Sequence, residues 1–168
     1  MKSYVWLGIL LFLTLTYATN LSAQSWTLQN PSEVPVELYD IYMDPTGFGW
    51  ACGEGGAVYY TDQFGASWTP RFAENALGNF FHIDYLSGSN GQNVIAAGTK
   101  IASTQDGGLT WNVWIPDSSL GAYNGVEAIN DSVAYIISNR GFLIKTEDAG
   151  LSWSNIPVPN PILRWSIQ

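Results

Sequence analysis

Short apolar runs alternate with clusters of Gly, Pro, Asn and Asp along most of this 168-residue chain. β-Branched and aromatic residues dominate the runs, and no stretch carries a helical period of apolar residues. The pattern therefore predicts short strands and an all-β fold. The first group of expected strands is Leu38 to Met43, Trp50 to Cys52 and Val58 to Tyr60, with a fourth strand opening at Trp68.

Residues typical of turns separate these strands, and the same order of strands and turns occurs twice more along the chain. Asp44 to Gly47 predicts a turn, and Glu54 to Gly56 predicts a hairpin. The corresponding strands of the second and third groups are Phe81 to Leu86, Val94 to Ala97 and Ile101 to Ser103, then Val126 to Ile129, Ala134 to Ile137 and Phe142 to Lys145.

Each group of strands closes with one eight-residue signature. The three copies occupy residues 61–68, 104–111 and 146–153, and each begins with Thr and ends with Trp. Their closing tryptophans are 43 and 42 residues apart, and Trp26 lies 42 residues before the first. A period of roughly 40 to 45 residues is characteristic of repeat architectures such as β-propellers.

A four-stranded unit of this length buries its faces only against neighbouring units, which predicts a β-propeller of four-stranded blades. The expected blades span about residues 36–72, 80–115 and 124–157. Residues 162–168 would start the next blade, and residues 25–29 would form an outer strand that closes the ring. Because a closed propeller has roughly 4 to 8 blades, the sequence predicts an incomplete propeller with three full blades and the start of a fourth.

Residues 1–23 have the features of a signal peptide, with a positive start, an uncharged apolar run from Tyr4 to Leu15 and small or polar residues after it. We expect cleavage after Ala23, with cleavage after Ala18 as the alternative, which leaves residues 24–168 for the partial propeller. The apolar run is shorter than the roughly 20 residues that a membrane span needs. We therefore expect export to the medium, the periplasm or the cell surface, and no stable membrane span after cleavage, in preference to an uncleaved anchor.

The chain is acidic, with 14 Asp and Glu against 6 Lys and Arg and a net charge of −8. Such a charge repels phosphate backbones and anionic lipid surfaces, so we expect no nucleic-acid partner. Cys52 is the single cysteine of the sequence. The fold must then be held by packing instead of a disulfide, and we expect the Cys52 side chain to be buried.

The residue types of the signature have a local physical explanation. A carboxylate in a tight turn accepts hydrogen bonds from backbone N–H groups that no neighbouring strand supplies. Glycine tolerates positive φ, and the tryptophan buries a large ring between sheets. The first copy has Gln63 at the Asp position, so its turn should be held less firmly. We expect structural roles for Thr61, Gln63, Gly65, Trp68, Thr104, Asp106, Gly108, Trp111, Thr146, Asp148, Gly150 and Trp153.

Metal sites are the alternative interpretation of carboxylate-bearing turns. One carboxylate per blade, at points far apart, cannot gather the 6 to 8 oxygens that Ca²⁺ takes. His82 is the single histidine, and no second His, Cys or acidic cluster stands at the spacing of a zinc site. We therefore expect no metal and no cofactor.

The signature resembles the Asp-box, also called the bacterial neuraminidase repeat. The longer unit, with Gly49 to Gly53 and Gly56 ahead of the signature, is similar to the repeats of the photosystem II assembly and stability factor family of propellers. This resemblance covers nearly all of residues 25–168. It implies a propeller with a binding or assembly role. The Asp-box also occurs in sialidases and in xyloglucan-degrading glycosidases, which keeps an enzymatic alternative open.

An enzymatic role makes demands on specific residues. Sialidases are known for three arginines at the propeller centre and a Tyr nucleophile. The arginines here are Arg71, Arg140 and Arg164, and Arg164 alone lies on an expected inner strand, so the set cannot assemble. Asp40 and Asp84 lie on two inner strands and could form a glycosidase pair. Aligning them requires a one-residue slip that turns one side chain to the other face, so we expect strand-end roles.

The sequence thus predicts an exported, non-catalytic propeller segment that binds a protein or a glycan across one face. The longer connections, Arg71 to Asn79 and Ile115 to Gly125, should lie on the face where propeller ligands usually sit. Trp50, Trp114 and Trp165 are expected to pack between blades and not to form a sugar platform. The alternative is a fragment of a secreted Asp-box glycoside hydrolase of the sialidase or xyloglucanase type, with its catalytic acids partly outside this chain.

Overall fold

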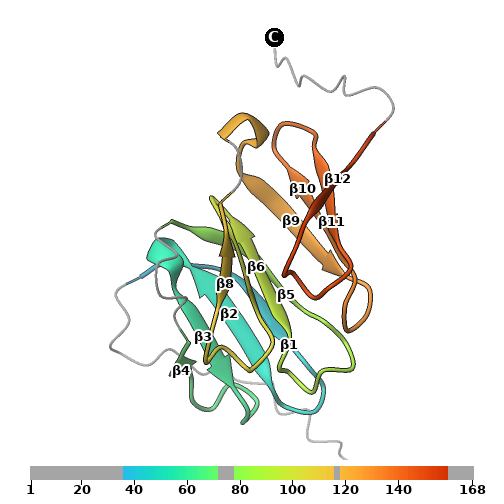
Figure 1. The fold of residues 1–168 in the computed structure, drawn as a ribbon. Helices are drawn as coiled ribbons and strands as arrows, with labels where there is room; N and C mark the ends of the chain where they lie inside the picture. Colours follow the sequence, from blue (N-terminus) through green and yellow to red (C-terminus); the bar gives the residue numbers. More distant parts are fainter. Residues whose placement is uncertain (1–35, 72–77, 116–117, 159–168) are drawn as a thin grey trace, which may run out of the picture.

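Twelve strands form three antiparallel sheets of four strands each in the computed structural model, which describes residues 36–71, 78–115 and 118–158 (Figure 1). None of these described residues forms an α-helix, and two short 3-10 turns lie at Glu54–Gly56 and Ser118–Leu120. The predicted all-β fold of four-stranded blades is therefore confirmed.

We call the three sheets blade 1, blade 2 and blade 3 in chain order. The strands of each blade follow one another from the inner to the outer edge, and every neighbouring pair is antiparallel. Their bounds are β1 Leu38–Met43, β2 Gly49–Gly53, β3 Val58–Thr61 and β4 Thr69–Pro70 in blade 1; β5 Phe80–Tyr85, β6 Val94–Gly98, β7 Ile101–Thr104 and β8 Asn112–Trp114 in blade 2; and β9 Tyr123–Ala128, β10 Ala134–Ser138, β11 Leu143–Thr146 and β12 Ser154–Ile156 in blade 3.

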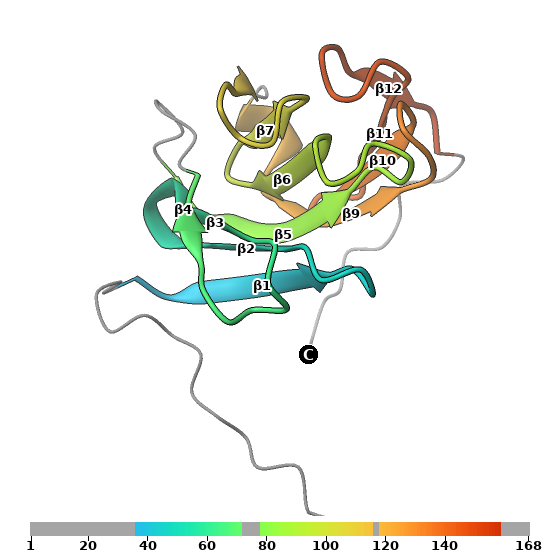
Figure 2. The same ribbon diagram turned by 90° about the horizontal axis from the view of Figure 1, so that it is seen from below.

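The inner strands β1, β5 and β9 follow one another side by side, and the blades fan outward from them (Figure 2). Blade 2 therefore has a neighbour on each face. A hydrophobic cluster fills the first interface, where Trp50 and Cys52 of β2 pack with Phe80 of β5 and Val94 of β6. Cys52 is fully buried, as expected, and this burial raises the pKa of its thiol to about 12.

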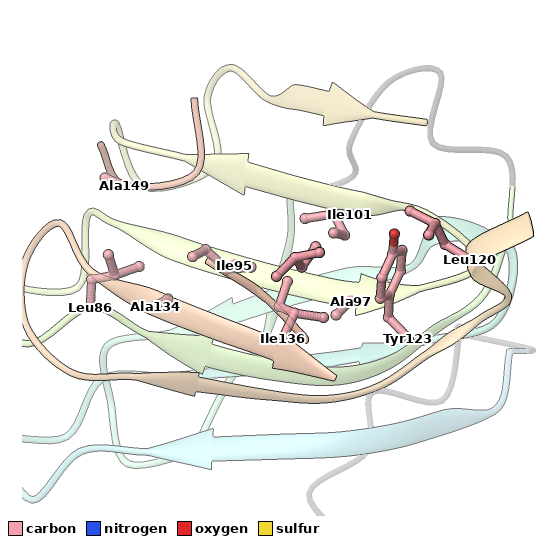
Figure 3. Close-up of a cluster of buried hydrophobic side chains, with 10 residues drawn as sticks. Leu86, Ile95, Ala97, Ile101, Leu120, Tyr123, Ala134, Ile136 and Ala149 are labelled. Carbon is pink, nitrogen blue, oxygen red and sulfur yellow. The ribbon is translucent and has the colours of Figure 1, made fainter. Parts of the chain in front are cut away.

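A second cluster fills the interface between blades 2 and 3 (Figure 3). Ile95 of β6 and Leu86, which directly follows β5, pack with Tyr123 of β9 and Ile136 of β10, and all four side chains are buried. The apolar faces that the sequence pattern predicted are thus buried between blades, and the two interfaces hold most of the core.

Each inner strand contains a β-bulge at the same place. The register shifts add one extra residue to each strand, namely Tyr39 in β1, Phe81 in β5 and Asn124 in β9. Bulges bend a strand and redirect the side chain of the extra residue. The fold therefore places three redirected side chains at the same end of the three inner strands.

Several predicted segments lie outside the described residues. These are the signal peptide at 1–23, the ring-closing strand at 25–29 and the start of a further blade at 162–168, with Arg164 and Trp165. The described part of the chain has no helix with the length and hydropathy of a membrane span.

Candidate functional site

The signature turns connect the third and fourth strands of each blade. In blade 2, the Thr104 hydroxyl accepts the N–H groups of Asp106 (3.3 Å) and Gly108 (2.9 Å) and donates to the Asp106 carboxylate (2.8 Å). Asp106 also accepts the N–H of Leu109 (3.0 Å) and both the N–H and the hydroxyl of Thr110 (2.9 and 2.6 Å). One carboxylate thus organises the whole turn.

Blade 3 repeats this geometry. The Thr146 hydroxyl accepts the N–H of Gly150 (2.8 Å) and donates to Asp148 (2.8 Å). Asp148 in turn accepts the N–H and the hydroxyl of Ser152 (2.8 and 2.6 Å). The second and third turns are therefore built from equivalent hydrogen bonds.

The turn of blade 1 keeps the threonine and lacks the carboxylate. The Thr61 hydroxyl accepts the N–H groups of Gln63 (3.3 Å) and Gly65 (3.2 Å). Gln63 stands where the other blades have an aspartate, and its amide carries no charge to attract the donors of the turn. Hydrogen bonds to a charged acceptor are stronger than those to a neutral one.

The turn carboxylates are stabilised in their charged form. The hydroxyl of Thr110 is the largest influence that lowers the pKa of Asp106, to about 2, and backbone N–H groups add to it. The hydroxyl of Ser152 likewise lowers the pKa of Asp148. Within the described residues, no three His, Cys, Asp or Glu side chains gather to hold a metal ion.

Each of the later signature turns also contacts the preceding blade. Gly108 has a φ of +80°, and a Cβ there would lie 2.9 Å from the Cβ of Arg71. Gly150 has a φ of +85°, and a Cβ there would lie 2.5 Å from the Cβ of Ser103. Glycine is required at both positions by backbone conformation and by close approach.

The closing tryptophans occupy equivalent places. Trp111 packs edge to face against Trp50, with ring centroids 6.3 Å apart, in the interface of blades 1 and 2. Trp153 packs in the interface of blades 2 and 3, and Trp68 packs beside Tyr59 on the other face of blade 1. Trp114 also contacts a residue of the next blade, since its ring centroid lies 6.3 Å from that of Tyr123.

Asp40 and Asp84 connect the inner strands of neighbouring blades. Asp40 Oδ2 accepts the N–H of Ile83 in β5 (3.0 Å), and Asp84 Oδ2 accepts the N–H of Ala128 in β9 (2.7 Å). The Oδ1 atom of each aspartate accepts the N–H of the residue that follows it. Both oxygens of each carboxylate are thus engaged by backbone donors.

The register expected for these two aspartates is wrong. Asp40 lies opposite Cys52 in β2, and His82 holds the corresponding place in blade 2, opposite Ala97. Asp84 is two residues further along β5, so the two carboxylates lie on the same side of their blades. This alignment is obtained when the residues of β1 and β5 are numbered from the bulge of each strand, and not from its first apolar residue.

The surroundings of the two carboxylates differ. Burial is the largest influence that raises the pKa of Asp84, and the charges of Glu127 and Asp40 add to it, whereas the N–H groups of Ala128 and Tyr85 oppose it. The Nδ1 atom of His82 lies 3.6 Å from Asp40 Oδ2.

Neither of the described arginines is part of an inner strand. The guanidinium of Arg71 lies 5.9 Å from the ring centroid of Tyr60, and Arg140 donates to the carbonyl oxygen of Ser119 (3.0 Å). Arg71 follows blade 1, and Arg140 is in the β10–β11 hairpin of blade 3. The structure therefore does not bring these two together.

An aromatic pair at the bulges was not predicted from the sequence. The rings of Tyr39 and Phe81 meet between β1 and β5 with centroids 5.6 Å apart and planes inclined by 47°. Tyr39 is 40% exposed, and Phe81 is half-buried. Their separation of 42 residues equals the repeat period, and this spacing is the sequence feature from which the pair could have been predicted.

Two acidic residues adjoin this pair. The Tyr39 hydroxyl donates to Glu37 Oε2 (3.3 Å), and the N–H of Glu54 donates to the carbonyl oxygen of Glu37 (2.8 Å). Burial and the charges of Glu37 and Glu54 raise the pKa of Tyr39. We call the end of the inner strands that carries Tyr39, Phe81 and Asn124 the hairpin end, because the hairpin at Glu54 lies beside it.

No protein-family model and no curated protein matches this sequence. Solved structures do match the fold. One is YCF48 bound to D1 peptide, with 23% identity, a TM-score of 0.61 and coverage of 71% of this chain and 40% of the other. Another is YCF48 from Cyanidioschyzon merolae, with 26% identity, a TM-score of 0.59 and coverage of 73% and 41%.

A third similar structure is an ancestral GH74 enzyme, with 17% identity, a TM-score of 0.59 and coverage of 80% of this chain and 19% of the other. The chain thus spans about two fifths of the YCF48 chains and a smaller share of the enzyme. These likenesses and the three stacked four-stranded sheets show that the fold is that of β-propeller blades, in an incomplete ring.

Proposed function

We propose that this chain is part of an exported, non-catalytic β-propeller that binds a protein segment at its hairpin end. The observation that carries the proposal is the Tyr39–Phe81 pair, which exposes aromatic surface at the bulges of two neighbouring inner strands. Bulges often redirect side chains at functional sites, and exposed aromatic residues are favoured at binding surfaces. YCF48, whose fold is similar, has been solved with a bound peptide.

The inner-strand carboxylates support binding over catalysis. A glycosidase needs one carboxyl group to donate a proton and another to attack or to activate water. Asp40 and Asp84 instead accept backbone N–H groups of their own and the next blade. These bonds favour a role in holding the blades together.

We also assign the signature turns to the Asp-box class of repeats and give them a structural role. The threonine, aspartate and glycine of blades 2 and 3 form the same local hydrogen bonds, and the tryptophans pack at equivalent places. The likeness to YCF48 supports a relation to the photosystem II assembly factor type of repeat. A glycan in place of a protein segment is the other ligand class that an aromatic surface accepts.

A random-peptide display selection against the full protein tests the binding proposal. We expect enriched peptides whose binding is lost in the Tyr39→Ala, Phe81→Ala double variant and in Asn124→Arg. Leu109→Ser, at the signature turn of blade 2, is the matched control and should bind normally. Failure to enrich any peptide, or equal binding by all variants with native circular dichroism, would overturn the proposal.

The runner-up function is glycoside hydrolysis. The similar GH74 enzyme and the raised pKa of Asp84 favour it, because a general acid needs a raised pKa. Incubation of the full protein with xyloglucan and with a sialoside separates the two functions. Hydrolysis that disappears in Asp84→Asn would replace the binding proposal.

Export rests on the sequence features of residues 1–23. Expression in a bacterial host with separation of cytosol, periplasm and medium tests it. We expect a mature protein that begins at Gln24 outside the cytosol, as read by N-terminal sequencing. A protein that keeps Met1 in the cytosol would contradict export.

A further inference from the structure

The hairpin end of blades 1 and 2 combines an aromatic surface with negative charge. The ring of Tyr39 packs against Phe81 on one side and remains partly exposed. An aromatic ring attracts a cation to its face, and the attraction grows when the cation is partly desolvated. The pair therefore offers a surface that suits a positively charged group better than a carboxylate or a phosphate.

The carboxylates are placed to strengthen this preference. Glu37 accepts the Tyr39 hydroxyl at 3.3 Å, which fixes one carboxylate at the edge of the ring. The backbone hydrogen bond from Glu54 to Glu37 brings the two acidic residues together, and both are exposed. Asn79 Oδ1 accepts the N–H of Gly55 (3.1 Å), which ties this hairpin to the start of blade 2.

We propose that the hairpin end binds the side chain of an arginine or lysine in a partner protein segment, with the cation between the Tyr39 ring and the Glu37 and Glu54 carboxylates. This inference rests on the proposed binding function and names the chemistry of its partner. The net charge of −8 adds long-range attraction for a basic segment. Asn124, the bulge residue of β9, is exposed at the same end and offers an amide to the backbone of the segment.

The test compares a cation with its uncharged analogue. Nα-acetyl-arginine amide and Nα-acetyl-citrulline amide differ in charge and hardly in shape, and both are titrated into the isotopically labelled full protein. We expect the arginine compound to shift the amide resonances of Tyr39, Gly55 and Phe81, and the citrulline compound to shift them at least threefold less at equal concentration. Equal shifts by the two compounds would overturn the proposal.

Variants separate the ring from the charge. Tyr39→Phe keeps the ring and should bind within about twofold of the unaltered protein, whereas Tyr39→Leu removes it and should weaken binding about two- to fivefold. Glu37→Gln should weaken binding and flatten its dependence on salt. Leu109→Gln, at a signature turn, is the control and should leave binding unchanged. Full binding by Tyr39→Leu with a native spectrum would contradict the role of the ring.

The outcomes also distinguish this inference from the proposed function. Display selection could enrich peptides that lack Lys and Arg but compete with the arginine compound for the site at Tyr39. In that case the proposed binding function stands, and the inference that the site prefers a cation fails. If the arginine compound binds at the hairpin end and no peptide is enriched, the site for a cation stands and the proposed protein-binding function fails.

Discussion

The side chain of Tyr123 makes both a favourable and an unfavourable contribution to the free energy of folding. It is fully buried in the cluster between blades 2 and 3 (Figure 3). Its ring also packs against that of Trp114. Its hydroxyl has no hydrogen-bond partner among the described residues, and burial raises its pKa to about 12. Burying a polar group without a partner is unfavourable, whereas burying the ring is favourable.

Replacement of Tyr123 should therefore separate the two contributions. Tyr123→Phe should leave the free energy of unfolding unchanged or raise it by about 1 kcal/mol, because the unpartnered hydroxyl is removed. Tyr123→Ala should lower it by about 3–5 kcal/mol, because the ring is lost and a cavity remains. Urea denaturation of the two variants measures both effects. A clear loss of stability in Tyr123→Phe would show that the hydroxyl is hydrogen bonded.

The signature turn is the element whose stability depends most directly on one carboxylate. Asp148→Ala removes the acceptor of two hydrogen bonds from Ser152 and should lower the free energy of unfolding by about 1–3 kcal/mol. Gln63→Asp is the converse substitution, because it introduces the missing carboxylate into the turn of blade 1. There the Thr61 hydroxyl already accepts the N–H groups of residues 63 and 65. It should raise stability by about 0.5–1.5 kcal/mol. Thermal melts that show no change in either variant would contradict this role of the carboxylate.

The same turn has a predictable pH dependence. Asp106 has a pKa lowered from 3.8 to about 2 in the folded state, so its charged form favours folding. Its contribution is present above the unfolded-state pKa and is lost as the pH falls through the folded-state value. Urea midpoints of the protein and of Asp106→Asn should therefore differ at pH 5–7, converge below about 4 and meet near pH 2. A difference that persists unchanged at pH 2 would show that the carboxylate charge is not involved.

The pattern of strands could be read from the sequence, whereas the register of the inner strands could not. Repetition placed β1, β2 and β3 within one or two residues, because apolar runs and turn residues recur with the same period. A bulge leaves no mark in an apolar run, so the alignment of Asp40 with Asp84 was misjudged, and β9 begins at Tyr123 instead of Val126. The Tyr39–Phe81 pair was missed for the same reason, since its meeting depends on the bulges.

At the scale of the whole molecule, stability depends on how one blade fits against the next. The two interfaces are built alike, with a tryptophan, a signature glycine and an inner-strand aspartate each reaching the neighbouring blade. A repeat protein of this kind is stabilised mainly by contacts between neighbouring units. Changes at an interface should therefore destabilise more than the same changes at an uncovered position.

Gly65 and Gly150 allow that expectation to be tested with matched backbones. Both have positive φ, at +80° and +85°, so alanine strains either backbone by a similar amount of about 1–2 kcal/mol. A Cβ at Gly65 would find its nearest neighbour at 3.7 Å, in Trp68 of the same turn. A Cβ at Gly150 would lie 2.5 Å from Ser103 of blade 2. Gly150→Ala should therefore cost about 1–3 kcal/mol more than Gly65→Ala.

A double-mutant cycle, measured by chemical denaturation, tests whether the additional cost of Gly150→Ala arises at the interface of blades 2 and 3. Ser103→Gly removes the Cβ that an alanine at position 150 would meet, together with the hydrogen bond from the Ser103 hydroxyl to the Gly150 carbonyl oxygen (2.9 Å). In that background Gly150→Ala should cost no more than Gly65→Ala, which leaves a favourable coupling of about 1–3 kcal/mol. Additive losses would mean that the close approach of the two blades does not limit stability. A coupling of the expected sign would show that the third blade is held by its fit against the second.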